Sequence, residues 1–395
     1  MNQIAICTAF LKLGLSSFGG PTAHIGFFRE EFVKAKRWIG ETDFSYLLAI
    51  CQFLPGPTSS QLAFAIGMRQ GGSLGAYAAL LSFSLPSILV MTFLGIGYSL
   101  DILSLSYLAI SGLSSVAIPV VGVAVFTMYK TFCTDNLEKL IFLCISIITI
   151  YFDLIAYPLI ILITGWLVGL LFLKEVPLED SEIVTVSNLN KYHVYTVILL
   201  GIIAFLTLNF FAVGSDYNLF RQLFNTGFLV FGGGHVVLPL LQGPFINSGL
   251  VSKEEFLLGY GIAQAIPGPL FSFASYLGSL TYDSTVFYKL LYGFYFLIFL
   301  YSSTFVLTPI ALYFWSRLSK SRIFKKGLKG VNIAVSAILF SSYLVFVIPS
   351  IVNNEWAIAF TALTLIFILI LKFPIWITVL LMGCIGYSID KFLLI

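Results

Sequence analysis

Two motifs of this sequence occur twice, in the same order and at nearly the same spacing. Phe18-Gly19-Gly20 recurs as Phe231-Gly232-Gly233, and a histidine follows each copy within a few residues. Further along, Gln52-Phe-Leu-Pro-Gly-Pro57 recurs as Gln264-Ala-Ile-Pro-Gly-Pro269. An ordered series of matches in both halves indicates an internal duplication, so the fold must be built from two related repeats.

The composition places both repeats in a membrane. Of the 395 residues, 59% are hydrophobic and 10% are charged, which is more apolar surface than a water-soluble domain can bury. A net charge of +3 spread over the chain gives no basic surface for nucleic acid. We expect an all-α, multi-pass protein of the cell membrane, because a helix satisfies its own backbone hydrogen bonds in lipid.

Continuous and interrupted apolar segments alternate along the chain. The continuous candidates are 75–98, 107–129, 140–151, 157–173, 194–213, 290–315, 331–348, 356–371 and 374–389. Four others, 9–28, 44–68, 224–241 and 256–278, carry glycine and proline breaks near their middles. The longest polar stretch predicts a first repeat at 1–173, a linker at 174–193, and a connecting helix with the second repeat at 194–395.

Charge indicates that the two repeats are inverted relative to each other. The loop 316–330 contains six lysines and arginines and no acid, whereas its first-half counterpart, 99–106, has only Asp101. Conversely, four basic residues lie between Arg29 and Arg37, and the matching stretch 242–255 has only Lys253. Because basic residues collect on the cytoplasmic side, matching loops are expected on opposite sides. The broken segments are expected to re-enter, although the alternative that some cross stays open.

The Pro-Gly-Pro motifs predict helix N-termini inside the membrane. Gly56 allows a sharp turn, Pro57 can begin a new helix, and the next backbone amides then have no acceptor within that helix. Such an N-terminus carries partial positive charge and favours an oxyanion. Inverted repeats with broken helices are also the architecture in which secondary transporters place substrate near the membrane midplane.

The candidate substrate-binding residues lie at or beside these breaks. Ionisable groups inside apolar segments suggest a function, since they are costly in lipid, and packing or snorkelling is the alternative for each. The two glutamines could donate to an oxyanion or satisfy backbone carbonyls. The full set is Lys12, Gly19, Gly20, His24, Gln52, Gly56, Thr58, Ser59, Ser60, Gln61, Gly232, Gly233, His235, Gln264, Gly268 and Ser272.

The first half resembles the chromate ion transporter family. The resemblance covers Phe10-Leu-Lys-Leu-Gly-Leu-Ser-Ser-Phe-Gly-Gly-Pro-Thr-Ala-His24, Trp38 and Gln52-Phe-Leu-Pro-Gly-Pro-Thr-Ser-Ser-Gln61. Phe231-Gly-Gly-Gly-His-Val-Val-Leu-Pro-Leu240 and the second Pro-Gly-Pro resemble the family's second domain, with Gly234 in place of Pro21. The resemblance implies a two-domain exporter of chromate that also recognises sulfate.

Other functions fit the sequence less well. An embedded enzyme is not expected, because neither an H-E-x-x-H helix nor an acid/base pair occurs in an apolar segment. The five cysteines are isolated, so neither a metal nor another cofactor is expected. A passive anion channel and a transporter of another small anion remain alternatives. A proton as coupling ion and a homodimer are also left open.

Overall fold

The computed structural model describes residues 2–103, 105–173, 191–211, 215–231, 233–281, 285–318, 321–350 and 354–393, and every regular element in these ranges is helical. The α-helices are α1 (Gln3–Ser16), α2 (Gly20–Phe28), α3 (Glu41–Phe53), α4 (Thr58–Ser99), α5 (Tyr107–Ser115), α6 (Ala117–Phe132), α7 (Asn136–Tyr151), α8 (Pro158–Phe172), α9 (Lys191–Leu206), α10 (Ser215–Leu229), α11 (Val237–Gln242), α12 (Lys253–Ala263), α13 (Phe273–Thr281), α14 (Val286–Leu300), α15 (Ser302–Leu318), α16 (Arg322–Ser342), α17 (Glu355–Leu365) and α18 (Ile375–Leu393). The 3-10 and π turns are η1 (Arg29–Ala35), η2 (Leu154–Ala156), η3 (Thr207–Phe211), η4 (Gly234–Val236), η5 (Gly243–Asn247), η6 (Leu270–Ser272), η7 (Tyr343–Val347), η8 (Ile348–Ser350) and η9 (Ile366–Ile370).

The predicted all-α, multi-pass membrane class is confirmed. Within the described ranges, six helical stretches are long and apolar enough to span a bilayer: Thr58–Ser99, Tyr107–Phe132, Lys191–Phe210, Val286–Trp315, Arg322–Ser350 and Ile375–Leu393. The segments predicted at 140–151, 157–173 and 356–371 are also helical, but their helices are shorter. Most of the predicted linker, residues 174–190, lies outside the described residues, and α9 begins at Lys191.

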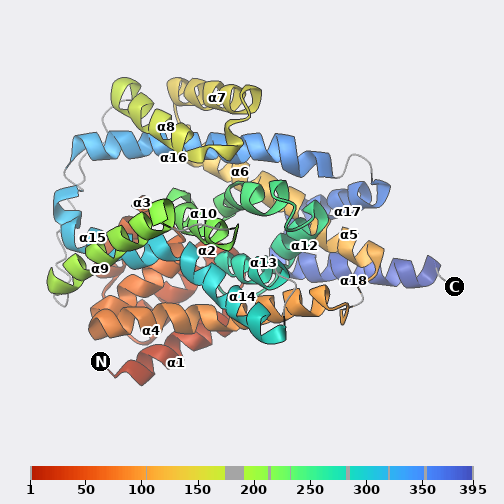
Figure 1. Cartoon of the computed structure of the whole chain (residues 1–395), viewed down its shortest axis with the longest axis horizontal. Coiled ribbons are helices and arrows are strands. Elements are labelled where there is room, and N and C mark those ends of the chain that lie inside the picture. The colour runs from red at the N-terminus through yellow and green to blue at the C-terminus, as the bar shows by residue number, and fades with distance from the viewer. Residues whose placement is uncertain are drawn as a thin grey trace.

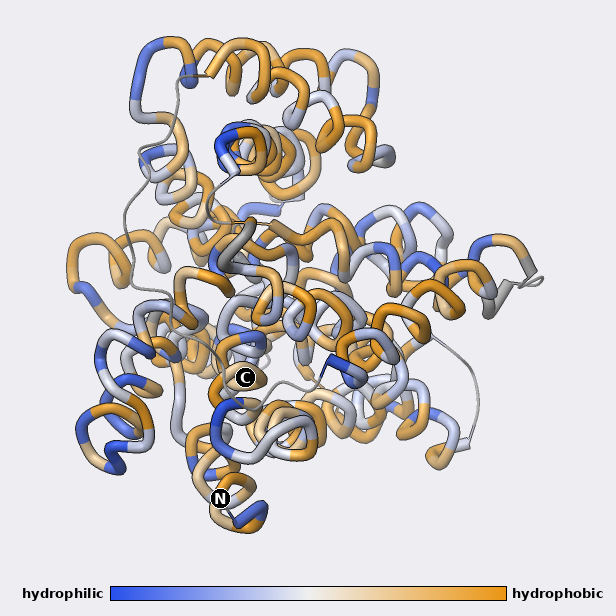
Figure 2. Tube along the Cα trace, turned by 90° about the vertical axis from the view of Figure 1, so that its left-hand side faces the viewer, coloured by the Kyte–Doolittle hydropathy of each residue, from blue (hydrophilic) through white to orange (hydrophobic). Residues whose placement is uncertain are grey.

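Helix α8 shows that the outer surface of the protein is apolar, as contact with lipid requires. Leu159, Ile163 and Leu167 are each more than half exposed, while Ile161 and Gly165 on the other side are buried. The buried side packs on α16, which α7 and α8 cross at one edge of the molecule (Figure 1). Hydrophobic residues run along most helices, and hydrophilic ones gather mainly at turns and helix ends (Figure 2). The exposed apolar side chains therefore form a surface that lipid can cover.

The first broken segment is a hairpin made by α1 and α2. These helices are separated by a break after Ser16, and α2 begins at Gly20. Lys12 of α1 forms an ion pair with Glu31 beyond α2, at 3.1 Å between Nζ and Oε2. Phe10 of α1 also packs edge-on against Phe28 of α2. The two helices therefore run antiparallel, and the break lies at the tip of the hairpin.

The second hairpin joins α3 to the first part of α4. Asp43 at the start of α3 forms an ion pair with Arg69, so the ends furthest from Pro-Gly-Pro lie together. Helix α4 then reverses at Gly72, whose φ of +65° is non-helical. The two sides of this turn are in contact: a Cβ added to Gly67, before the turn, would lie 2.4 Å from the carbonyl oxygen of Gly75, after it. Such close packing is impossible in a straight helix, so the chain folds back on itself at Gly72.

The hairpins of the second repeat open at the other face. Helices α12 and α13 are antiparallel, because Tyr276 Oη donates to the Glu255 carbonyl at 3.3 Å. Glu255 also lines a cavity of about 640 Å³ with Tyr98 and Asp101, at the far end of α4. The stretch of α4 from Gly72 to Tyr98 is about 40 Å long at 1.5 Å per residue. The two sets of hairpins thus enter the molecule from opposite ends of this helix.

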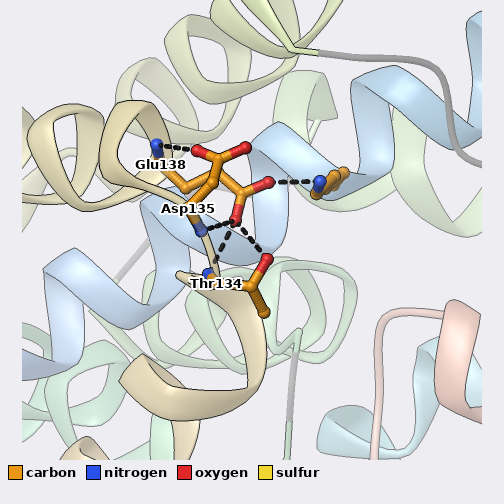
Figure 3. Close-up of polar contacts among 4 residues, drawn as sticks. Thr134, Asp135 and Glu138 are labelled. Carbon is orange, nitrogen blue, oxygen red and sulfur yellow. Dashed lines mark hydrogen bonds and ion pairs between the residues drawn. The ribbon is translucent and has the colours of Figure 1, made fainter.

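A buried ion pair fastens the first repeat to the second. Glu138, in the first turn of α7, is fully buried and pairs with Lys329 of α16. It also accepts hydrogen bonds from the Thr134 hydroxyl and from the backbone amides of Thr134 and Asp135, at 2.7–3.1 Å (Figure 3). Burial raises the pKa of this carboxyl, but the bonds from Lys329, Asp135 and Thr134 outweigh it and lower the pKa to about 2. The carboxylate therefore stays ionised and holds α7 on α16.

Candidate functional site

The tips of the hairpins meet through two reciprocal backbone hydrogen bonds. The Gly56 N–H donates to the carbonyl of Val230, just before the second Phe-Gly-Gly, at 2.6 Å. The Gly268 N–H donates to the carbonyl of Ser17, just before the first Phe-Gly-Gly, at 3.0 Å. Each Pro-Gly-Pro turn is thus bonded to the Phe-Gly-Gly break of the other repeat, so the duplicated motifs form one interlocked centre.

The glycines at this centre adopt backbone conformations that other residues rarely tolerate. Their φ angles lie on the positive side in both repeats, which explains why glycine stands at each position. These angles are +100° at Gly19, +76° at Gly20, +125° at Gly56, +135° at Gly233 and +103° at Gly268. Gly232 lies outside the described residues.

The first Pro-Gly-Pro turn leads into a polar helix N-terminus. Helix α4 begins at Thr58 after Pro57, and no side chain caps it. Its first-turn amides therefore have no acceptor within the helix. Thr58 is half-buried, Ser59 and Ser60 are buried, and Gln61 is fully buried with its Nε2 donating to the Pro55 carbonyl at 2.7 Å. This N-terminus has the donors that the sequence predicts for an oxyanion site.

Hydroxyl groups that the sequence analysis missed surround this N-terminus. Tyr301, between α14 and α15 of the second repeat, lies with its Oη 3.2 Å from Ser60 Oγ and 3.0 Å from Ser84 Oγ. Ser303 Oγ would be 2.7 Å from a Cβ added to Gly56. A signal existed, since the run Ser302-Ser303-Thr304 interrupts the apolar segment 290–315 and Ser84 interrupts 75–98.

The second Pro-Gly-Pro turn also contains a glycine with positive φ, but the two residues that follow it are apolar. Leu270 and Phe271 follow it where Thr58 and Ser59 follow the first turn, and both are buried. The Phe271 ring stacks on Tyr301, with 6.0 Å between the ring centroids. Ser272 is buried at the end of η6, which precedes the nine-residue α13. Gly268 lies beside Ser87, whose Oγ would be 3.0 Å from an added Cβ.

The two histidines have different partners. His24 is fully buried, and its Nε2 is 3.1 Å from the Ser17 carbonyl, the same carbonyl that accepts the Gly268 N–H. His235 is half-buried, and its Nδ1 lies 2.8 Å from Tyr260 Oη. Each histidine therefore bonds within its own repeat, but the carbonyl that His24 contacts also accepts the bond from Gly268 of the other repeat.

Two predicted site residues have exposed side chains. Lys12 pairs with Glu31, and its side chain is 66% exposed. Gln52 is exposed on α3, although its counterpart Gln264 is buried. The polar side chains at the first turn, Ser59, Ser60, Gln61, Tyr301 and Ser303, are all uncharged. In the part of the chain that the structure describes, no cluster of three or more metal-ligating side chains occurs.

Comparisons with known proteins place this arrangement among membrane transporters. A family model described as "Chromate transporter" matches residues 4–170 and again 217–387. An uncharacterized transporter of Methanocaldococcus jannaschii is 28% identical over 70% of this chain and 69% of its own length. A probable chromate transport protein of Synechococcus elongatus is 30% identical, over 69% and 67%. A chromate transport protein of Pseudomonas aeruginosa is 26% identical, over 70% and 66%. No solved structure matches the chain.

Proposed function

We propose that this chain, which belongs to the chromate transporter family, is a secondary active exporter of a divalent tetrahedral oxyanion. Chromate is the proposed substrate, and sulfate is a related one because it has the same charge and shape. The proposed site is the N-terminus of α4 at the first Pro-Gly-Pro turn.

One observation carries this proposal: a helix N-terminus with buried uncharged donors lies where the two repeats interlock. The first-turn amides of α4 and the hydroxyl of Ser59 can replace part of the hydration shell of a dianion. The partial positive charge of the helix N-terminus adds to this attraction. Because the donors are neutral, the site can release the dianion again without breaking an ion pair.

The energy for export is proposed to come from the membrane. This sequence contains no G-x-x-x-x-G-K-[ST] motif, which argues against nucleotide binding by that route. An inside-negative potential favours outward movement of an anion by about 2.3 kcal/mol per charge per 100 mV, and a dianion gains twice that. A proton gradient is a further source, with His24 and His235 as the nearest titratable candidates.

The geometry also supports alternating access. The reciprocal bonds of Gly56 and Gly268 close the centre from both sides, while the hairpins open to opposite faces. Breaking one contact at a time would admit the anion from one face only. Because the loop 316–330 is rich in lysine and arginine, we assign the end of the molecule that carries this loop to the cytoplasmic side.

Uptake of labelled chromate or sulfate into inverted membrane vesicles tests this function. We expect accumulation above the outside concentration, competition between the two anions, and loss of accumulation when an ionophore removes the gradients. Vesicles from cells that do not express the protein, at matched total membrane protein, are the control for background uptake. Flux that only equilibrates the anion would identify a channel, and uptake no greater than the control would contradict the proposal.

A further inference from the structure

We propose that Tyr301 and Ser303, both from the second repeat, complete the oxyanion site of the first repeat with their hydroxyl groups. This inference rests on the proposed function of the α4 N-terminus as the substrate site. It adds two specificity-determining residues that neither duplicated motif contains, and it makes the site a joint product of both repeats.

Tyr301 presents its hydroxyl to the start of α4. The side chain is fully buried, and its Oη lies within hydrogen-bond distance of Ser60 Oγ and Ser84 Oγ. A phenol oxygen can accept two hydrogen bonds and still donate its own proton. When both serines donate to it, the remaining O–H of Tyr301 is available to an anion that approaches the α4 amides.

Ser303 is the second and independent observation. Its side chain is fully buried, and within the described part of the chain its Oγ has no hydrogen-bond partner. This oxygen lies beside Gly56, 2.7 Å from the position of an added Cβ, so it is directed at the turn where α4 begins. A buried hydroxyl without a partner destabilises a fold. A bound oxyanion would accept its proton and remove that cost.

Together these groups define the class of ligand. Backbone amides, serine hydroxyls and a tyrosine hydroxyl offer several donors around one point, and none carries a charge. A small tetrahedral anion has acceptor lone pairs on each of its four oxygens and can use donors from several directions at once. We therefore assign the site to fully deprotonated tetrahedral oxyanions such as chromate and sulfate.

The ring of Tyr301 connects the two turns. It stacks on Phe271, which follows the second Pro-Gly-Pro, while its hydroxyl reaches Ser60 after the first. A movement of the second turn that shifts Phe271 would also move a donor in the substrate site. Tyr301 is thus placed to link opening of the second repeat to anion affinity at the first.

The experiment uses the purified full-length protein and two single-oxygen deletions, Tyr301→Phe and Ser303→Ala. Each keeps the packing, including the ring on Phe271, so the variants test the two hydroxyls separately. We expect the chromate and sulfate concentrations for half-maximal protection against thermal unfolding to rise about tenfold in each, as for a lost hydrogen bond to a charged group. Half-saturation of flux in proteoliposomes should rise in parallel.

Matched controls remove equivalent oxygens elsewhere. Tyr276→Phe deletes a buried phenol oxygen that donates to the Glu255 carbonyl, and Ser341→Ala deletes a buried hydroxyl that donates to the Ser146 carbonyl. Both control variants should need the same chromate and sulfate concentrations as the wild type for half-maximal protection against thermal unfolding.

The outcomes separate this inference from the proposed function. Wild-type flux with unchanged half-saturation in both variants would overturn the role of Tyr301 and Ser303 and leave the transporter intact. Protection that is lost in the variants, in a protein without uphill flux, would support the site and overturn active transport. If neither chromate nor sulfate protects or is carried by the wild type, both proposals fail.

Discussion

The two Pro-Gly-Pro turns share a glycine conformation but differ in the first two residues that follow them. Both contain a glycine with positive φ whose N–H donates across to the other repeat. The first leads into Thr58, Ser59 and Ser60, whereas the second leads into Leu270 and Phe271. Duplication has therefore preserved the parts that hold the repeats together, while the side chains that can meet a ligand have diverged.

This difference indicates how two related, inverted repeats can form a single binding site that only one of the two turns provides. If both turns were polar, two dianions could bind close together and repel each other. With Phe271 beside Tyr301, the second turn acts as apolar packing against the first site.

The largest expected effect tests the inversion itself. In a background without the five natural cysteines, Ile323→Cys and Ile102→Cys should react with a membrane-impermeant maleimide from opposite sides of the membrane. Both isoleucines are well exposed, at 67% and 72%, so reactivity reports sidedness rather than burial. Labelling is measured in intact cells and in inverted vesicles, and reaction of both from the same side would rule out inverted repeats.

Glycine replacements should separate the two turns next. Leucine at Gly56 or Gly268 should abolish transport, because each needs positive φ and each turn is closely packed. Alanine should discriminate: its Cβ would be 2.5 Å from Gln61 Nε2 at position 56, but 3.0 Å from Ser87 Oγ at 268. We expect initial rates of chromate flux to fall about tenfold for Gly56→Ala and about threefold for Gly268→Ala, a difference of about 0.7 kcal/mol.

The amount of inserted protein provides the control for these four variants. Size-exclusion chromatography of the solubilised membranes should recover each variant as a single folded species. Equal losses for the two alanine variants would show that the turns contribute alike, and normal transport by both leucine variants would place the anion elsewhere.

The histidine variants should give the smallest difference. His24→Gln should weaken the inter-repeat contact at the Ser17 carbonyl and lower stability by about 1 kcal/mol, a shift of a few degrees in melting temperature. His235→Gln should change it less, since His235 is half-buried and its partner Tyr260, unlike Ser17, is not the acceptor of a backbone bond from the other repeat. Thermal unfolding of the two purified variants checks this order.

Anion exchange and gradient-driven flux, measured side by side on the same two variants, test whether either histidine couples anion transport to a proton gradient. A variant that exchanges anion normally but no longer responds to an imposed pH gradient would identify its histidine as the coupling group. Wild-type behaviour of both variants in every assay would leave the histidines as packing residues.

The sequence predicts the scaffold better than it predicts the site. Glycine at positions 56 and 268 reveals the turns, because positive φ is a local requirement that a motif records. Tyr301 meets Ser60 across 241 positions of the chain, and no local pattern encodes that distance. Gln52 and Gln264 match in sequence but differ in exposure, since tertiary packing decides which side chain turns inward.

The interlocked tips also set an order for biogenesis. The Gly56 N–H finds its acceptor only at Val230, and Gly268 then reaches back to Ser17. Because the N-terminal half leaves the ribosome first, it must wait in the membrane with a backbone donor that lipid cannot satisfy. A chain that stops after the first repeat would lack this acceptor until a second repeat supplied one.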